Sequence, residues 1–418
     1  MWSDSQWGAL VALIDRDQGS MVALQRELTS RPALAPTSGG VGEVQKSDYL
    51  RGYLKDLKLD VTEHRCPDGR VPCGYRPSLV SLLPGQDTSR TVWIMTHLDV
   101  VPPGSLELWN SNPFEAVVQG DRIIGRGVED NQQELVSSVH AAKALLELGL
   151  TPQYNLGLVM VADEETGSQY GIEYVLRNEP RLQPQDLIVV ADAGNALGNE
   201  IEIAEKSIIW LRIATTGRQA HASNPHRGLN ALRAGSKILL HLDQVLDEHF
   251  PAQDQLFSPP VSTAEPTKRE PNVANINTIP GEDVFYIDCR LLPHYQVEDL
   301  LGLVRSEAER LAEELGVRVS ITTEQLQHAA PPTSSDASVV KLLGKAIAAV
   351  LGHTPKVTGI GGGTVAAFFR RLGLPTAVWG HYAGTAHQPN EYCLIPNMVE
   401  DAKVYAYLLG LTPQDVDT

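Results

Sequence analysis

Four short apolar runs, each followed within a few residues by histidine or carboxylate side chains, stand out along the chain. They lie at residues 92–95, 156–162, 187–191 and 375–379, and each has about the length of a buried strand. Strands of a parallel sheet are buried on both faces and therefore read as continuous apolar runs. The pattern predicts an α/β fold with a mostly parallel central sheet.

The polar residues that follow these runs are of the types that bind metals in hydrolases. They are His97, Asp99, Asp130, Glu164, Glu165, Asp192 and His387, with Asp130 opening a helical stretch between the first two runs. The carboxyl ends of parallel strands meet at one edge of a sheet, where α/β proteins collect their ligands. Two imidazoles and several carboxylates at that edge predict a hydrolase with two divalent metals, in which one carboxylate bridges the ions.

Each of these residues also has a structural interpretation when it is taken alone. Asp130 is a good helix cap, and His97 suits a buried core. In a metal centre we also expect a role for Asp99. It should orient the His97 imidazole, because a ligating histidine usually bonds a carboxylate through its other nitrogen. His381 competes with His387 for the ligand position after the fourth run.

The remaining periodicity predicts two domains. The first thirty residues predict one amphipathic helix, and residues 132–148 and 338–351 predict two more, the former capped by Asp130. Near Lys206 the alternation changes to a β-α-β-β-α-β order, which is typical of a compact inserted unit. Its predicted elements are strand 208–215, helix 229–248, strands 273–278 and 284–291, helix 297–315 and strand 318–322, with an exposed loop at 257–271. The predicted domains are a catalytic domain at 1–206 and 324–418, interrupted by an inserted domain at 207–323.

Composition excludes several classes of function. With 418 residues and a hydrophobic fraction of 42%, the chain is long enough for two cores, and its net charge of −17 argues against a nucleic-acid partner. No stretch is long and apolar enough to predict a membrane span. The N-terminal residues lack the segments of a signal peptide, so we expect a cytoplasmic protein. A nucleotide-binding protein is disfavoured, since no glycine-rich loop directly follows the first strand.

Five short motifs occur in order between about residues 90 and 400. They are Thr96-His97-Leu98-Asp99-Val100-Val101-Pro102, Gly125-Arg126-Gly127-Val128-Glu129-Asp130, Asp163-Glu164-Glu165-Thr166-Gly167, Ala220-His221-Ala222-Ser223-Asn224-Pro225 and His387-Gln388-Pro389-Asn390-Glu391. The set resembles the co-catalytic metallopeptidase and deacylase family that includes aminoacylase, acetylornithine deacetylase, succinyl-diaminopimelate desuccinylase and glutamate carboxypeptidase. That resemblance implies a zinc-peptidase-like catalytic domain and an inserted α+β lid or dimerisation domain.

The resemblance also implies a role for each candidate in the metal centre. It gives His97 and Asp192 to one metal, Glu165 and His387 to the other, and Asp130 to both, with a cis peptide between Asp130 and Asn131. Glu164 would be the general base that takes a proton from the bridging water. The metals would be two divalent ions, with zinc expected first and cobalt or manganese as alternatives.

On the substrate side, the resemblance implies contributions from the inserted domain. His221 would stabilise the oxyanion of the tetrahedral intermediate, from the partner subunit of a homodimer. Arg290 would bind a substrate carboxylate, as the guanidinium fork favours. Further contacts are expected from Asn275, Gly362, Gly363 and Thr364, the last three in a glycine-rich loop predicted to open a helix.

Three departures from the family pattern bear on the substrate. After Asp130 the chain reads Asn131-Gln132-Gln133 where many members carry Lys-Gly, and after Thr364 it reads Val365-Ala366-Ala367 where many carry Ser-Asp. Asp192 replaces the Glu of the deacetylase and desuccinylase branches, which favours a peptidase. None of these departures removes a metal ligand or the base.

Together these observations predict hydrolysis of an amide bond in a small carboxylate-bearing substrate by a metal-bridged hydroxide. Two versions stay open: deacylation of an N-acyl amino acid such as succinyl-diaminopimelate, and cleavage of a dipeptide or C-terminal peptide. A metal-binding but inactive scaffold or binding protein is the alternative from a different class. The intact Glu164 argues against it, since a scaffold needs no base.

Overall fold

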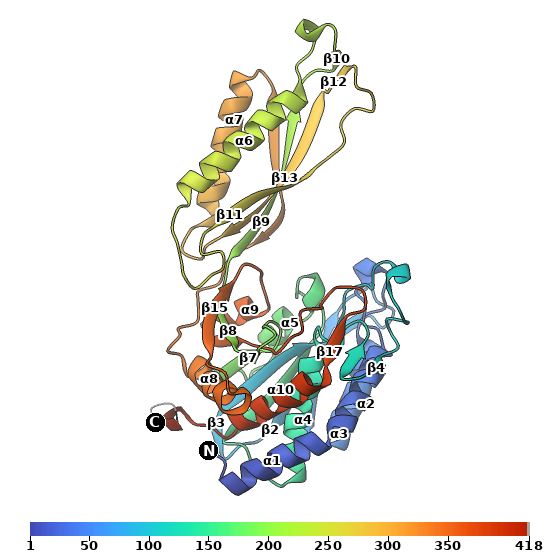
Figure 1. The fold of residues 1–418 in the computed structure, drawn as a ribbon, viewed down its shortest axis with the longest axis vertical. Helices are drawn as coiled ribbons and strands as arrows, with labels where there is room; N and C mark the ends of the chain where they lie inside the picture. Colours follow the sequence, from blue (N-terminus) through green and yellow to red (C-terminus); the bar gives the residue numbers. More distant parts are fainter. Residues whose placement is uncertain (416–418) are drawn as a thin grey trace. The chain divides into compact units, whose positions relative to one another are not determined.

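A computed structural model of the chain describes residues 1–415, which form two compact units (Figure 1). The larger unit holds residues 1–203, 333–357 and 364–415, and the inserted unit holds 204–332 and 358–363. Among the described residues, no helix is long and apolar enough to cross a membrane. From the sequence, the inserted unit was expected at residues 207–323.

The centre of the larger unit is an eight-stranded sheet. β3 (Asp87–His97) lies between β6 (Tyr154–Val161) and β7 (Leu187–Val190), and β7 pairs with β16 (Thr376–Val378), all in parallel. These strands are the four apolar runs, so the predicted parallel core of the sheet is confirmed. The outer strands are β1 (Asp60–Pro67) and β2 (Tyr75–Leu83) on one side and β8 (Glu200–Glu205) and β15 (Lys356–Ile360) on the other. Because β1, β2 and β8 pair antiparallel, the complete sheet is mixed.

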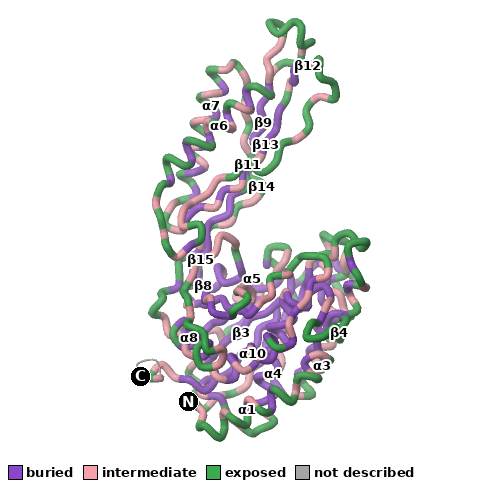
Figure 2. The backbone as a smooth tube through the Cα atoms, in the orientation of Figure 1, coloured by how far each residue is buried: buried purple, intermediate pink, exposed green. Residues whose placement is uncertain are grey.

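Helices bury this sheet, and Figure 2 shows its central strands as buried. α4 packs against β3 and β6, whereas Ile172 of α5 and Phe369 of α9 pack around Trp93 of β3. The helices of this unit are α1 (Asp4–Arg16), α2 (Gln18–Thr29), α3 (Val44–Asp56), α4 (Gln132–Glu147), α5 (Ile172–Asn178), α8 (Ser338–Leu351), α9 (Ala366–Arg371) and α10 (Ile395–Leu408). The predictions of α4 and α8 are confirmed to within one residue.

The inserted unit is a four-stranded antiparallel sheet with two helices on one face. Its elements are β9 (Ser207–Thr216), α6 (Ala231–His249), β11 (Thr263–Arg269), β13 (Glu282–Leu291), α7 (Val297–Glu314) and β14 (Arg318–Gln327), and the strand order is β11-β13-β9-β14. α6 and α7 lie side by side (Figure 1), over a core that includes Ile209, Leu211, Ile213 and Phe285. The predicted β-α-β-β-α-β order is therefore present.

Three predicted elements are wrong in detail. The segment 257–271, expected to be a loop, contains the edge strand β11, whose residues are mostly polar and exposed and so give no alternating signal. The segment 273–278, expected to be a strand, supplies only Thr278 to the short β12 (Thr278–Ile279), which pairs with β10 (Ala220–His221). The N-terminal helix is two helices, because the chain breaks at Asp17, whose carboxylate lies 2.6 Å from Lys143 Nζ.

Two predicted helix starts also differ. Asn131 and not Asp130 occupies the cap position of α4, and its side chain makes no capping hydrogen bond. α9 begins at Ala366, two residues after Thr364, and has six residues. Thr364 Oγ1 instead accepts the N–H of Ala366, 3.1 Å away. The Asp130 carboxylate is engaged elsewhere, in the site described below.

A glycine in β6 tests the packing of the sheet. A Cβ at Gly157 would lie 2.0 Å from the Trp93 ring, which is fixed by a 2.8 Å bond from Nε1 to Asp186. Gly157→Ala should therefore lower the free energy of unfolding by about 1–3 kcal/mol, as overpacked cores do. Gly52→Ala in α3 is the matched control: nothing lies near its Cβ, so it should raise stability by about 0.4–1 kcal/mol. Denaturant unfolding measures both, and equal effects would contradict the packing argument.

Candidate metal centre

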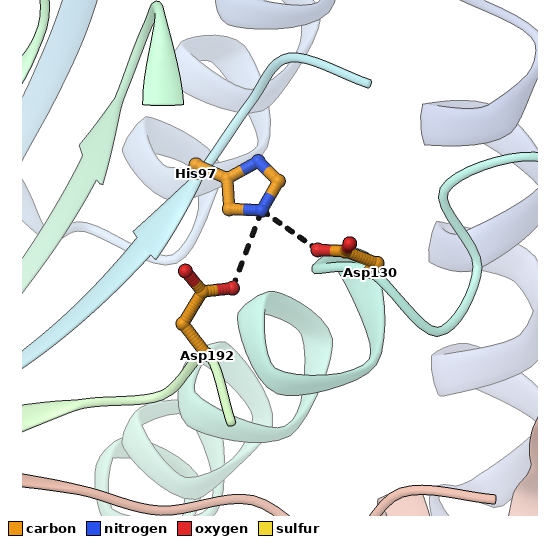
Figure 3. Close-up of side chains that lie close together, drawn as sticks. All are labelled: His97, Asp130 and Asp192. Carbon is orange, nitrogen blue, oxygen red and sulfur yellow. Dashed lines mark hydrogen bonds and ion pairs between the residues drawn. The ribbon is translucent and has the colours of Figure 1, made fainter. Parts of the chain in front are cut away.

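The first of two side-chain groups lies at the carboxyl ends of the central strands (Figure 3). His97 ends β3, Asp192 follows β7, and Asp130 precedes α4. His97 Nε2 lies 2.9 Å from Asp130 Oδ1 and 3.4 Å from Asp192 Oδ1, and the ligand atoms of the three lie within 4.8 Å of one another. One imidazole nitrogen and two carboxylate oxygens thus face a common point.

The second group shares Asp130. His387 Nε2 lies 2.9 Å from Asp130 Oδ2 and 3.3 Å from Glu165 Oε2, and these atoms also lie within 4.8 Å of one another. Asp130 therefore offers one oxygen to each group, as a bridging carboxylate requires. The competing His381 belongs to neither group, and its ring bonds the main-chain oxygen of Ala196 instead.

The electrostatics of the centre fit bound cations. Burial and the Asp130 charge raise the pKa of Glu165 to about 7, and burial and the Asp192 charge raise the pKa of Glu164 well above its usual value. Glu165 Oε1 is buried and has no hydrogen-bond partner among the described residues. Carboxylates crowded in this way repel one another, and divalent ions would relieve that repulsion.

The imidazoles respond to the same charges. Burial alone would lower the pKa of His97, but Asp192 and Asp130 raise it well above its usual value. Bonds to Asp130 and Glu165 raise the pKa of His387 to about 10. A histidine that binds a metal must be neutral, so a cation held by these rings would have to displace any proton that they carry.

Asp99 holds the loop that carries Glu164 and Glu165. Its two carboxylate oxygens accept the main-chain N–H groups of these residues, each at 3.1 Å. The nearest partner of His97 Nδ1 is the main-chain oxygen of Asp99, at 2.9 Å, whereas the carboxylate is 3.6 Å away. The His97 ring thus has both the main-chain oxygen and the carboxylate of Asp99 beside Nδ1, and the role of the carboxylate in orienting the imidazole stays a prediction.

Glu391 and Glu129 join the loops that carry Asp130 and His387. Glu391 accepts the N–H groups of Gly127, Glu129 and Asp130 at 3.0–3.1 Å, and Arg126 Nη1 lies 2.5 Å from it. In return, Glu129 accepts N–H groups from Gly384 and Thr385 in the loop before His387. The two buried carboxylates thus brace the two loops against each other. Their neighbouring strands β5 (Arg122–Ile124) and β17 (Tyr392–Leu394) also pair.

Asn131 connects the first group to the sheet. Its Oδ1 accepts the N–H of His97 at 3.0 Å, and its Nδ2 donates to Asp192 Oδ1 at 3.1 Å and to the main chain of Ala191. The peptide between Asp130 and Asn131 is cis, as predicted. The sequence predicted the cis peptide to Asn131 but no role for the Asn131 side chain, and it gave Glu129 and Glu391 no role, although all three residues lie inside or beside the motifs.

The inserted unit carries the other predicted residues. His221 is exposed, and its Nδ1 lies 2.7 Å from Ser223 Oγ. Asn275 Nδ2 donates to Thr278 Oγ1 at 2.8 Å, and Thr278 pairs with His221 between β12 and β10, so these two predicted residues belong to one small ribbon. The metal-centre candidates all lie in the larger unit.

Arg290 is already partly engaged. Its Nε and Nη2 donate to the two carboxylate oxygens of Asp288 at 2.7 and 2.9 Å, and its Nη1 donates to Gly361 O at 3.0 Å. A salt bridge and a contact with the glycine-rich loop are therefore both present. Gly362 and Gly363 follow Gly361 in the inserted unit, while Thr364 belongs to the larger one.

Comparisons with known proteins agree with this geometry. Residues 93–410 match the model of peptidase family M20/M25/M40. The chain is 39% identical over 409 residues to an uncharacterized metallohydrolase of Methanococcus maripaludis, covering 93% of this chain and 98% of that one. It is 28% identical over 391 residues to succinyl-diaminopimelate desuccinylase of Gluconacetobacter diazotrophicus, covering 93% and 96%. Human carnosine dipeptidase 1 has the same fold, with a TM-score of 0.74 at 16% identity over 96% and 98% of the two chains.

The chain therefore belongs to peptidase family M20/M25/M40 and is a metallohydrolase. The predicted fold class, a peptidase-like α/β domain with an inserted α+β domain, is confirmed.

The brace between the two loops can be tested at Glu391. Glu391→Gln replaces an acceptor oxygen with an N–H₂ group that faces main-chain donors, so the loop carrying Asp130 should loosen. We expect metal affinity to fall about 10–100-fold, the usual cost of losing a partner that supports a metal ligand. Competition with a chromogenic chelator measures it. Glu313→Gln, an exposed change on α7, is the control, and equal affinities in both variants would contradict a bracing role.

Proposed function

We propose that the protein hydrolyses an amide bond in a small carboxylate-bearing substrate with two divalent metals, zinc first among them. The observation that carries the proposal is the shared position of Asp130, whose two oxygens face separate histidines at 2.9 Å. His97 and Asp192 would hold one ion, and Glu165 and His387 the other. When bound, the metals would polarise the substrate carbonyl and make water a better nucleophile.

Glu164 is the proposed general base. It stands next to a proposed ligand, Glu165, on the turn after β6, and Asp99 fixes the amides of both. A raised pKa suits a group that takes a proton from water and returns it to the leaving amine. An inactive scaffold on this fold would need no such group, so the intact Glu164 favours an enzyme.

Most of the residues proposed to bind the substrate lie in the inserted unit. We propose that Arg290 binds the substrate carboxylate, helped by the loop at Gly362, Gly363 and Thr364, and that Asn275 and His221 contact the scissile group. His221 would act from the partner subunit of a homodimer formed through the inserted unit, which leaves two strand edges, β11 and β14, for pairing. We place the protein in the cytoplasm.

Two reactions remain as candidates, each with support. The identity to a succinyl-diaminopimelate desuccinylase favours deacylation of an N-acyl amino acid. Asp192 in place of Glu favours peptide cleavage. Both reactions would use the proposed metals and base, so they differ in the substrate groups on either side of the scissile amide bond.

Metal removal combined with a substrate panel tests the proposal. Protein stripped with a chelator should hydrolyse neither N-acyl amino acids nor dipeptides, and zinc, cobalt or manganese should restore activity at two ions per chain. Elemental analysis of each sample gives the stoichiometry. Full activity in protein shown to be metal-free would overturn the proposal.

The adjacent glutamates should separate into base and ligand. Glu164→Gln should lose roughly 10²–10⁴ in kcat, the usual worth of general acid–base catalysis, while it keeps both metals. Glu165→Gln is the matched comparison and should lose metal, because it removes a ligand oxygen. Steady-state kinetics and metal analysis distinguish them. Loss of metal by Glu164→Gln would make that residue a ligand instead.

Complementation tests the action of His221 across a dimer. His221→Ala should lose about 10²–10³ in kcat with its metals intact, the usual cost of one oxyanion donor. Mixing it with Glu164→Gln and allowing subunits to exchange should restore one working site per mixed dimer. Confirmed exchange without recovery of activity would place His221 in its own subunit, and a fully active monomer would exclude the arrangement.

A further inference from the structure

The open face of the inserted unit's sheet contains a cavity that the proposed function does not use. Its volume is about 560 Å³, within the range of small-molecule sites. Trp210 of β9 and Tyr286 of β13 line it, and Trp210 is 40% exposed although it lies on a central strand. α6 and α7 cover the opposite face, where Phe285 and Ile287 are buried.

Irregularities in both edge strands shape this cavity. The pairing of β11 shifts between Pro266 and Lys268, and that of β14 shifts between Thr323 and Gln325. The extra residues, Thr267 and Glu324, both line the cavity, from opposite edges of the sheet. Bulges bend strands and re-aim side chains, and they recur beside functional sites. The two bulges therefore help to shape the sheet around the cavity.

The strand register places the cavity beside Arg290. Trp210 pairs with Asp288, and Arg290 is two residues further along the same face of β13, about 7 Å away. Tyr286 is two residues in the other direction, diagonal to Trp210, a spacing of roughly 7–8 Å that aromatic side chains span. A ring placed between them can contact both.

The Arg290 end offers hydrogen-bond donors beside a carboxylate that is already paired, since Asp288, which also lines the cavity, accepts from Nε and Nη2 of Arg290. Two of the five N–H groups of Arg290 have no partner among the described residues. Lys206 lies near it, bonded to main-chain oxygens of Pro259 and Val261, and burial and the Arg290 charge lower the pKa of Lys206. Lys268, in the cavity, forms no ion pair with a described carboxylate and lies over the Tyr286 ring.

We propose that this face selects substrates whose carboxylate is carried by an aromatic amino acid. The carboxylate would bind Arg290, and the aromatic side chain would lie in the cavity between Trp210 and Tyr286. An aromatic amino acid carries both groups on one short skeleton, and the long Arg290 side chain, which bends toward Asp288, brings its guanidinium closer to the cavity. The inference rests on the proposed function for the reaction, and it narrows the substrate to N-acyl derivatives or dipeptides with an aromatic carboxyl-terminal residue.

The test compares matched substrates and variants of the full-length, metal-loaded protein. The substrates are N-acetyl-L-phenylalanine and N-acetyl-L-alanine, together with the dipeptides Ala-Phe and Ala-Ala. The variants are Trp210→Ala, Trp210→Phe and, as a control, Leu240→Ala, which removes an exposed apolar side chain from α6. Thermal melting confirms that each variant is folded.

We expect kcat/KM to favour the phenylalanine substrates by about tenfold or more, as burial of a ring should provide. Trp210→Ala should lose most of this preference with little change for the alanine substrates, while Trp210→Phe and Leu240→Ala should keep it. An unchanged preference in Trp210→Ala, or no aromatic preference in the native protein, overturns the inference.

A binding experiment separates this inference from the proposed function. Calorimetry with Glu164→Gln protein should detect N-acetyl-L-phenylalanine and show weaker binding of its carboxamide. Binding that depends on Trp210, together with no hydrolysis of any of the four substrates by the metal-loaded native protein, would support the pocket and overturn the proposed function. Hydrolysis of alanine and phenylalanine substrates at equal rates would support the hydrolase and overturn the aromatic pocket.

Discussion

Buried carboxylates that accept main-chain N–H groups hold the metal centre together. All of its proposed ligands except His97, which ends β3, lie in turns or loops outside the strands of the sheet, so each of these segments needs another source of order. A carboxylate can accept several N–H groups at once, and low exposure strengthens these bonds. Glu391 and Asp99 each serve one ligand-bearing loop in this way, and Arg126 offsets the charge of Glu391. The segments that carry Asp130 and Glu165 are therefore held by hydrogen bonds within the protein itself.

Sequence reasoning identified what depends on local pattern and missed what depends on tertiary contacts. The parallel strands were predictable because burial on both faces makes them continuously apolar, and the metal candidates because they end those strands. The strand β11 was not predictable, because an exposed edge strand has no buried face to mark it. The Asp99 carboxylate also accepts the amides of Glu164 and Glu165, a contact that depends on the approach of β6 to β3. Its spacing from His97 could not show that.

The two faces of the inserted unit's sheet differ, because one is buried under helices and the other lines the cavity. Along β13, Phe285, Ile287 and Cys289 point into the core beneath the helices, while the residues between them, Tyr286 and Asp288, face the cavity. Because side chains alternate along a strand, residues that face the core and residues that face the cavity can be substituted independently. The same core can thus carry different pockets, which suits a family whose members share a fold and differ in substrate.

The two histidines of the centre differ sharply in exposure. The His97 side chain is fully buried, whereas that of His387 is 54% exposed. An ion held by His97 would lie against a ring that solvent does not reach, while one held by His387 would border the solvent. We therefore expect the two positions to exchange ions at different rates, with the inner one retaining its ion for long periods and the outer one sampling the metals available around it.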